Sequence, residues 1–101
     1  DNTTTADWEL SAPAGDVAFA RRYLDVEGDA DFTRRFIRAA LASVSDTAVI
    51  PMPDWLGLGA EARINTPSTL GGNWLWRMDP AALTDALAAD ILALTKLYGR
   101  C

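Results

Sequence analysis

Histidine is missing from the chain, and only one cysteine occurs among its 101 residues. Histidine is the usual general base near neutral pH and the commonest metal ligand. We therefore expect no metal site, and we also expect no cofactor. The lone Cys101 stands at the end of the sequence and cannot form an internal disulfide. A chain without disulfides is typical of a reducing compartment, which predicts a cytoplasmic protein.

Long apolar runs and positive charge are also scarce. No run is long enough to span a bilayer and no signal peptide is visible, so we expect no membrane partner. Nine basic residues stand against fourteen acidic ones, which gives a net charge of −5 and a pI near 4.4. Such a chain is poorly suited to a phosphate backbone, so no nucleic-acid partner is expected. An uncharged ligand fits this charge better.

Apolar residues make up half of the chain, enough for one domain-sized core. Residues 16–27, 29–45 and 79–98 have the periodicity of amphipathic helices. Aspartates can cap the start of each segment, and glycines can end the first and the last. These residues are Asp16, Asp29, Asp79, Gly28 and Gly99. Opposite the apolar stripe of the second segment stand Arg34, Arg35 and Arg38, which indicate a solvated face.

A short apolar run, TAVIPM at residues 47–52, has the pattern of a strand buried on both faces. Pro51 suits the end of such a strand. Residues 1–9 are polar and rich in threonine, which predicts a loop. The order of helices, buried strand, long loop and helix is typical of the end of an α/β pattern. One parallel-type strand cannot satisfy its own edges, so its partner strands should lie in sequence outside this chain.

Residues 51–77 combine proline, glycine and three tryptophans without helical or strand periodicity. Loops of this length are uncommon inside compact domains unless they are functional or disordered. Disordered segments are poor in aromatic residues, so a ligand-facing loop is the better interpretation. Single helical turns are expected around residues 54–58 and 60–63. Asp54, at the end of the predicted strand, is expected to cap the following turn or to orient a neighbour.

The loop sequence PMPDWLGLGAEARINTP, followed by GNWLWR, closely resembles the carboxyl-terminal signature of the 4-α-glucanotransferases, the amylomaltase family (glycoside hydrolase family 77). The family pattern runs PLQD-x-LGLG-x-EARMN-x-PG and then GNW-x-WR. The opening DNTTTADW resembles a second family motif, HDN-x-TT-x-GW, whose histidine would precede Asp1. Pro53 replaces the glutamine of the first motif and removes a side-chain amide, while Ser68 and Asp7 replace glycines.

The resemblance implies the fold and the activity. Residues 1–101 would form a single carboxyl-terminal fragment of a (β/α)8 barrel, comprising its last strand and surrounding helices, and would be mostly helical in isolation. The complete enzyme would transfer α-1,4-glucan segments between maltodextrins by a retaining double displacement. The expected partners are a maltooligosaccharide and the missing amino-terminal part of the same barrel. The fragment alone is expected to be inactive, because the nucleophile and the acid/base residue belong to upstream motifs.

The resemblance also suggests residue roles. Asp1 resembles the third catalytic carboxylate, which stabilises the positive charge of the transition state. Asn65 and Asn2 are expected to contact sugar hydroxyls, although each can instead satisfy a turn. Trp74 is a candidate for stacking on a sugar ring, although tryptophans more often anchor cores or loops. The spacing of Glu61 and Arg63, rather than the resemblance, indicates a further role: two residues apart in a short helical turn, they do not face each other and are expected to brace the loop through ion pairs with other segments.

Two other functions fit the same residues. The tryptophan-rich loop 51–77 could belong to a non-catalytic glucan-binding module. Alternatively, the apolar helix faces could serve a protein partner in a helical interaction domain without a role in sugar binding. The residues of that partner face would be Phe32, Phe36, Leu87 and Leu94.

Overall fold

The computed structural model describes residues 1–28 and 31–101, and every regular element within them is helical. The α-helices are α1 (Thr5–Ser11), α2 (Ala14–Tyr23), α3 (Phe32–Ala42), α4 (Met52–Trp55) and α5 (Asp85–Leu97). Two single 3₁₀ turns, η1 (Ala60–Ala62) and η2 (Pro80–Ala82), interrupt the connection from α4 to α5. None of these helices is long and apolar enough to cross a membrane.

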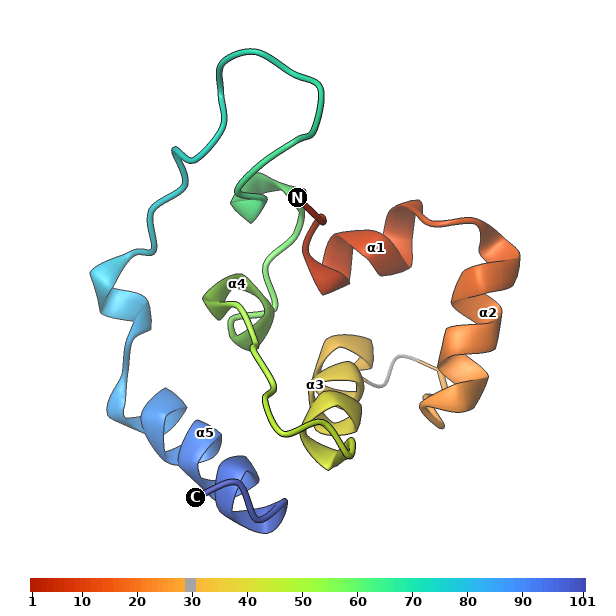
Figure 1. Cartoon of the computed structure of the whole chain (residues 1–101), viewed down its shortest axis with the longest axis vertical. Coiled ribbons are helices and arrows are strands. Elements are labelled where there is room, and N and C mark those ends of the chain that lie inside the picture. Colours follow the sequence, from red (N-terminus) through yellow and green to blue (C-terminus); the bar gives the residue numbers. More distant parts are fainter. Residues whose placement is uncertain (29–30) are drawn as a thin grey trace.

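Helix α3 lies at the centre of the arrangement and contacts α1, α4 and α5 (Figure 1). Asp31 caps its start by accepting a hydrogen bond from the backbone N–H of Arg34 at 2.9 Å. The predicted cap, Asp29, lies outside the described residues. Ile37 and Leu41 of α3 form a small core with Leu94 of α5. Partly buried side chains from the following segments pack against it: Ala48, Ile50, Trp55 and Tyr98.

The prediction of a loop over residues 1–9 is wrong, because α1 begins at Thr5. Thr4 caps this helix, since its hydroxyl accepts a hydrogen bond from the Asp7 N–H at 3.3 Å. Trp8 then stacks on Phe32 of α3, with ring centroids 6.0 Å apart. Capping and this aromatic contact outweigh the low helix propensity of a threonine-rich segment.

Helix α2 is shifted relative to its prediction. It begins at Ala14, so Asp16 lies in the first turn rather than at the cap. It ends at Tyr23 because Asp25 adopts a left-handed φ of 57° and closes a Schellman motif. In this motif the N–H of Val26 bonds the Arg21 carbonyl at 2.9 Å. The predicted terminator Gly28 therefore lies beyond the end of the helix.

The predicted strand at residues 47–52 is also absent from the described residues, which contain no second strand to pair with it. A strand requires a neighbouring ladder for its backbone groups, and a periodic sequence alone cannot supply one. The side chains nevertheless alternate. Ala48 and Ile50 pack on the core, whereas Val49 between them is 84% exposed.

Of the two helical turns predicted in the long loop, the second is present as η1, whereas the first, predicted around residues 54–58, is α4 and begins two residues earlier. Pro51 precedes α4, and the buried Pro53 occupies its first turn, where a missing N–H is tolerated. Gly57 ends α4 with a φ of 68°. The N–H of Leu58 bonds the Pro53 carbonyl at 2.9 Å across this turn. The chain then enters η1, where Ala62 is 1% exposed.

The helix predicted over residues 79–98 is divided in two. Asp79 caps only η2, since its carboxylate accepts from the Ala81 N–H at 2.9 Å. Leu83 leaves helical geometry, and Thr84 caps α5 by accepting from the Leu87 N–H at 3.1 Å. The predicted stop at Gly99 is confirmed, because Gly99 follows the helix with a left-handed φ of 68°.

Two arginines of α3 contact α5 or the residue that caps its carboxyl-terminal end, so the predicted solvated face is only partly solvated. Arg34 donates two parallel hydrogen bonds to Asp90, at 2.7 and 2.8 Å. Arg38 donates to the Tyr98 hydroxyl at 2.9 Å. The hydrogen bond from Arg34 lowers the pKa of Asp90, and Asp90 raises the pKa of Arg34. Arg35 remains exposed.

The chain exposes more surface than a compact domain of its mass. Its accessible area is 7044 Å², whereas a compact monomer of 10.9 kDa is expected to expose roughly 5,600 Å². Large apolar side chains contribute to this surface, since Leu10, Tyr23, Val49 and Leu70 are more than three-quarters exposed. Several helix faces are therefore available for packing against further protein.

We predict that Arg34→Ala lowers the free energy of unfolding by up to about 1 kcal/mol, because water screens a half-exposed ion pair. The stabilisation is present above the ordinary Asp90 pKa of 3.8 and is lost as the pH falls through the lowered pKa of the folded state. The melting temperatures of the wild type and of Arg34→Ala should therefore converge as the pH is lowered. A gap that stays constant into strong acid would contradict this role.

A second prediction concerns the link between α1 and α4. Asp54 accepts hydrogen bonds from the Thr5 N–H at 2.9 Å and from its hydroxyl at 3.0 Å. Asp54→Ala removes both acceptors and should cost about 1–3 kcal/mol of stability. The exposed Asp46 provides the control, since Asp46→Ala should leave the unfolding midpoint almost unchanged. Equal midpoints for the two variants would contradict the prediction.

Candidate functional site

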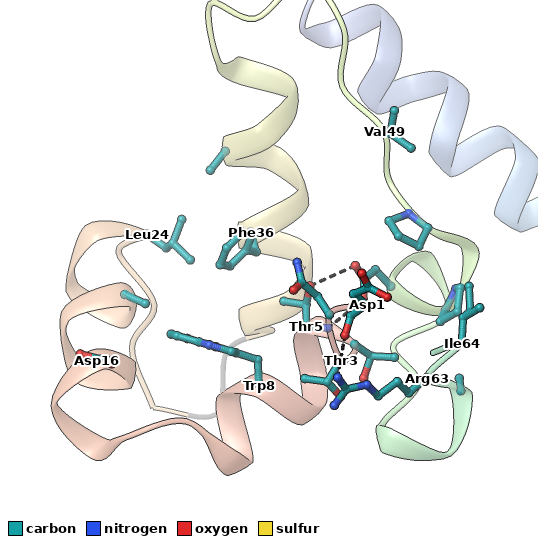
Figure 2. A pocket seen from close by; sticks show the side chains of 18 of the residues that line it. Asp1, Thr3, Thr5, Trp8, Asp16, Leu24, Phe36, Val49, Arg63 and Ile64 are labelled. Carbon is teal, nitrogen blue, oxygen red and sulfur yellow. Dashed lines mark hydrogen bonds between the residues drawn. The ribbon is translucent and has the colours of Figure 1, made fainter. Parts of the chain in front are cut away.

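The amino-terminal segment and the segment after η1 lie side by side, although more than sixty residues separate them (Figure 1). Arg63 joins them. Its Nη2 donates to the main-chain carbonyl of Asp1 at 2.6 Å, and its Nε donates to the carbonyl of Asn65 at 2.9 Å. Figure 2 shows Arg63 beside Asp1 and Thr3. The two sequence motifs therefore form one surface.

The side chains of Asp1 and Asn65 are in direct contact. The Asn65 amide Nδ2 donates a hydrogen bond to Oδ1 of the Asp1 carboxylate. An asparagine amide has two N–H donors and one carbonyl acceptor, so this bond uses one of the two donors. Two of the four predicted site residues are thus paired with each other.

The rest of the amino-terminal segment is fixed by its threonines. Thr3 donates its hydroxyl to the Asp7 carboxylate at 2.6 Å, and Thr4 is buried. Thr5 is held by Asp54, as described above. Asp54 thus orients a neighbour, one of the two roles predicted for it. Asp7 replaces a glycine of the family motif and supplies a contact that glycine could not make.

An open cavity of about 1300 Å³ lies beside this segment. Its polar end contains Asp1, Asn2 and Arg63, and α2 and α3 contribute an apolar wall that includes Phe19 and Phe36. Figure 2 shows Trp8, Leu24 and Phe36 along this wall, with Asp1 and Thr5 at the polar end. Charged and hydrogen-bonding groups converging at one end of an apolar hollow are typical of ligand sites.

The four predicted site residues do not all share this position. Asp1 and Asn2 line the cavity, whereas Asn65 is not part of the lining but is hydrogen-bonded to Asp1. Trp74 does not belong to the cavity lining described for the chain. It is 66% exposed and adopts a left-handed φ of 61°, while its N–H bonds the Ile64 carbonyl at 2.6 Å. This bond joins the two ends of residues 64–74, which form an outer loop.

Asn73 organises that outer loop, a role that sequence reasoning missed. Its Oδ1 accepts from the Thr66 N–H at 2.7 Å, and its Nδ2 donates to the Thr69 hydroxyl at 3.0 Å. Thr69 in turn donates to the Thr66 carbonyl at 2.6 Å. The available signal was an asparagine beside two glycines, a composition typical of turns.

The predicted ion pairs of Glu61 and Arg63 are not the contacts that the structure describes. Glu61 accepts from the N–H of Gly59 at 3.1 Å within its own turn. Arg63 bonds main-chain carbonyls instead of a carboxylate. A carbonyl is available at every residue, so the side-chain pattern alone could not identify these acceptors.

Known proteins are similar to this chain over nearly its whole length. The sequence profile described as 4-alpha-glucanotransferase matches residues 1–84. The chloroplastic/amyloplastic 4-alpha-glucanotransferase of Arabidopsis thaliana is 40% identical over 99% of this chain and 18% of its own length. The 4-alpha-glucanotransferase of Clostridium butyricum is 39% identical over 100% of this chain and 21% of its own length.

A solved structure is similar as well. The amylomaltase from Streptococcus agalactiae in complex with acarbose matches with a TM-score of 0.91 and 33% identity, over 99% of this chain and 20% of that one. This chain spans about a fifth of the length of the curated relatives it matches. The profile match covers most of the sequence and confirms the resemblance noted in both motifs. The chain therefore belongs to the glycoside hydrolase 77 family of 4-alpha-glucanotransferases.

Proposed function

We propose that this chain is the carboxyl-terminal portion of a 4-alpha-glucanotransferase that transfers α-1,4-glucan segments between maltodextrins. One observation carries the proposal. The Asp1 carboxylate and Asn65, from motifs far apart in the sequence, hydrogen-bond to each other at the polar end of a large cavity. The names of the relatives and the acarbose complex of the similar amylomaltase support a glucan as ligand.

Retention of configuration requires a nucleophilic carboxylate and a carboxylic acid about 5–5.5 Å apart, with an oxocarbenium-like transition state between them. We assign Asp1 to neither role. It acts as the third carboxylate, which stabilises the positive charge that develops on the sugar. The nucleophile and the acid/base residue come from the part of the enzyme outside this chain. Asn65 and Asn2 contact sugar hydroxyls beside Asp1.

Residues 1–101 form one piece of a (β/α)8 barrel in this proposal, with catalytic groups at the carboxyl ends of its strands. The alternation of Ala48, Val49 and Ile50 supports a strand that completes its ladder with the remainder of the barrel. That strand leads directly into α4 and the site loop. Exposed apolar side chains away from the cavity, such as Leu10 of α1 and Leu92 of α5, support the same conclusion, since in this proposal they pack against the missing amino-terminal part.

We propose a cytoplasmic location, because the single cysteine of this chain, Cys101, forms no internal disulfide. The plant relatives carry names that specify the chloroplast and amyloplast. Neither compartment is expected to impose a disulfide on the site.

We predict that Asp1→Ala or Asp1→Asn in the complete enzyme lowers kcat by about 10²–10³-fold, the effect of removing one preorganised group that stabilises transition-state charge. Disproportionation of maltotriose provides the measurement. The exposed Asp46 provides the matched control, because Asp46→Ala should retain normal turnover. An Asp1→Ala enzyme with near-normal turnover would exclude the catalytic role.

The exposure of Trp74 favours a second function for the loop, that of a glucan-binding surface. If Trp74 stacks on sugar, Trp74→Ala in the complete enzyme should raise KM for maltooligosaccharides roughly fivefold and leave kcat within about twofold, the effect of one aromatic contact. Leu70→Ala is the control, because Leu70 is fully exposed in the same loop.

Saturable quenching of tryptophan fluorescence when micromolar maltooligosaccharide is added to the isolated chain would favour the non-catalytic glucan-binding module over the enzyme.

A further inference from the structure

We infer that Arg63 is a positioning residue for the Asp1 carboxylate, and that it acts by joining the main chains of Asp1 and Asn65. The inference rests on the catalytic role proposed for Asp1. It assigns to Arg63 no contact with substrate of its own.

The contacts form a closed ring. Arg63 bonds the Asn65 carbonyl through Nε and the Asp1 carbonyl through Nη2. The ring closes where the Asn65 amide donates to the Asp1 carboxylate. One guanidinium therefore sets the separation of two main-chain segments whose side chains meet. If the separation changes, the bond from Asn65 to the carboxylate changes with it.

The position of a carboxylate follows from its backbone and two side-chain torsions. The carbonyl contact fixes the backbone of Asp1, and the Asn65 contact fixes one oxygen of the carboxyl group. The next anchor along the segment is at Thr3, which bonds Asp7. Arg63 thus contacts the main chain of Asp1, and Asn65 contacts its side chain.

The backbone of Arg63 is held in place by η1. Its backbone N–H bonds the Ala60 carbonyl at 3.1 Å and ends η1, and the preceding Ala62 is almost fully buried. An arginine suits this position because its planar group presents several donors in a fixed fork. A lysine has the same charge but one flexible ammonium, which is poorly suited to hold two separated carbonyls in a fixed geometry.

The experiment uses the complete enzyme and a double-mutant cycle on kcat. Arg63→Ala should lower kcat roughly 10–100-fold, with KM within about threefold, because a misplaced catalytic group affects the transition state more than substrate binding. Arg63→Lys should lose at least about tenfold, since charge alone does not restore the fork. In an Asp1→Asn background, Arg63→Ala should cost less than about threefold more, because the group that it positions is already disabled.

Arg100→Ala is the matched control. Arg100 also donates to main-chain carbonyls, those of Leu41, Ser43 and Ser45, but at the opposite end of α3 from Asp1. Its loss should lower the melting temperature and leave kcat within about twofold of the wild type. This variant shows what the loss of an arginine–carbonyl contact does when no catalytic group depends on it.

The outcomes are distinct. Effects of Arg63→Ala and Asp1→Asn that multiply in the double variant would overturn the inference, as would normal turnover of Arg63→Ala. If Arg63→Ala does not fold, the same double-mutant cycle is carried out with Arg63→Lys, and multiplying effects on kcat would again overturn the inference. If Asp1→Asn turns over normally, the proposed function of Asp1 fails. If Asp1→Asn is impaired and the cycle is additive, only the positioning role of Arg63 fails.

Discussion

The rest of the site depends on the hydrogen bonds that join Asp1 to Arg63 and Asn65, called here the Asp1 closure. It joins residues more than sixty positions apart, and hydrogen bonds rather than apolar packing hold it together. Such a contact is directional, so it determines where a carboxylate points as well as where the chain lies. The adjoining cavity has its polar end at this closure. Asp54 supports the arrangement from the other side by holding Thr5 at the start of α1.

The helices provide the base for this closure. The central position of α3 lets α1 and α4 pack against one helix, and α4 leads directly to η1 and Arg63. The apolar core that supports this arrangement is small. Within the described residues, Ile37, Leu41 and Leu94 form one buried cluster, and the other buried apolar side chains are Val26, Phe32 and Ala62. In a complete barrel, the open apolar surfaces would be covered by further strands and helices. The hydrogen-bonded site would then be supported by a much larger apolar interior than this chain contains.

Local signals predicted the elements that depend on local contacts. The apolar stripe of α3, the turns at α4 and η1 and the stop at Gly99 follow from periodicity and from glycine geometry. The predictions failed where contacts between residues far apart in the sequence determine the secondary structure. Trp8 stabilises α1 through Phe32, and a strand at 47–52 needs neighbours that the described chain does not contain. Motif resemblance indicated Asp1 and Asn65, but it gave no sign that Arg63 would bond two carbonyls, because main-chain acceptors are not specified by residue type.

Pro53 has a consequence for the energy of this site. It replaces the glutamine of the family motif and occupies the first turn of α4, immediately before Asp54. A proline in compatible geometry stabilises a protein by about 0.4–1 kcal/mol, because it restricts the unfolded chain. With Pro51 two positions earlier, the backbone around Asp54 is already partly ordered before folding. The entropy lost on ordering this turn is correspondingly smaller, so substitution of Pro53 by a flexible residue lowers the free energy of unfolding even where the hydrogen bonds between Asp54 and Thr5 are kept.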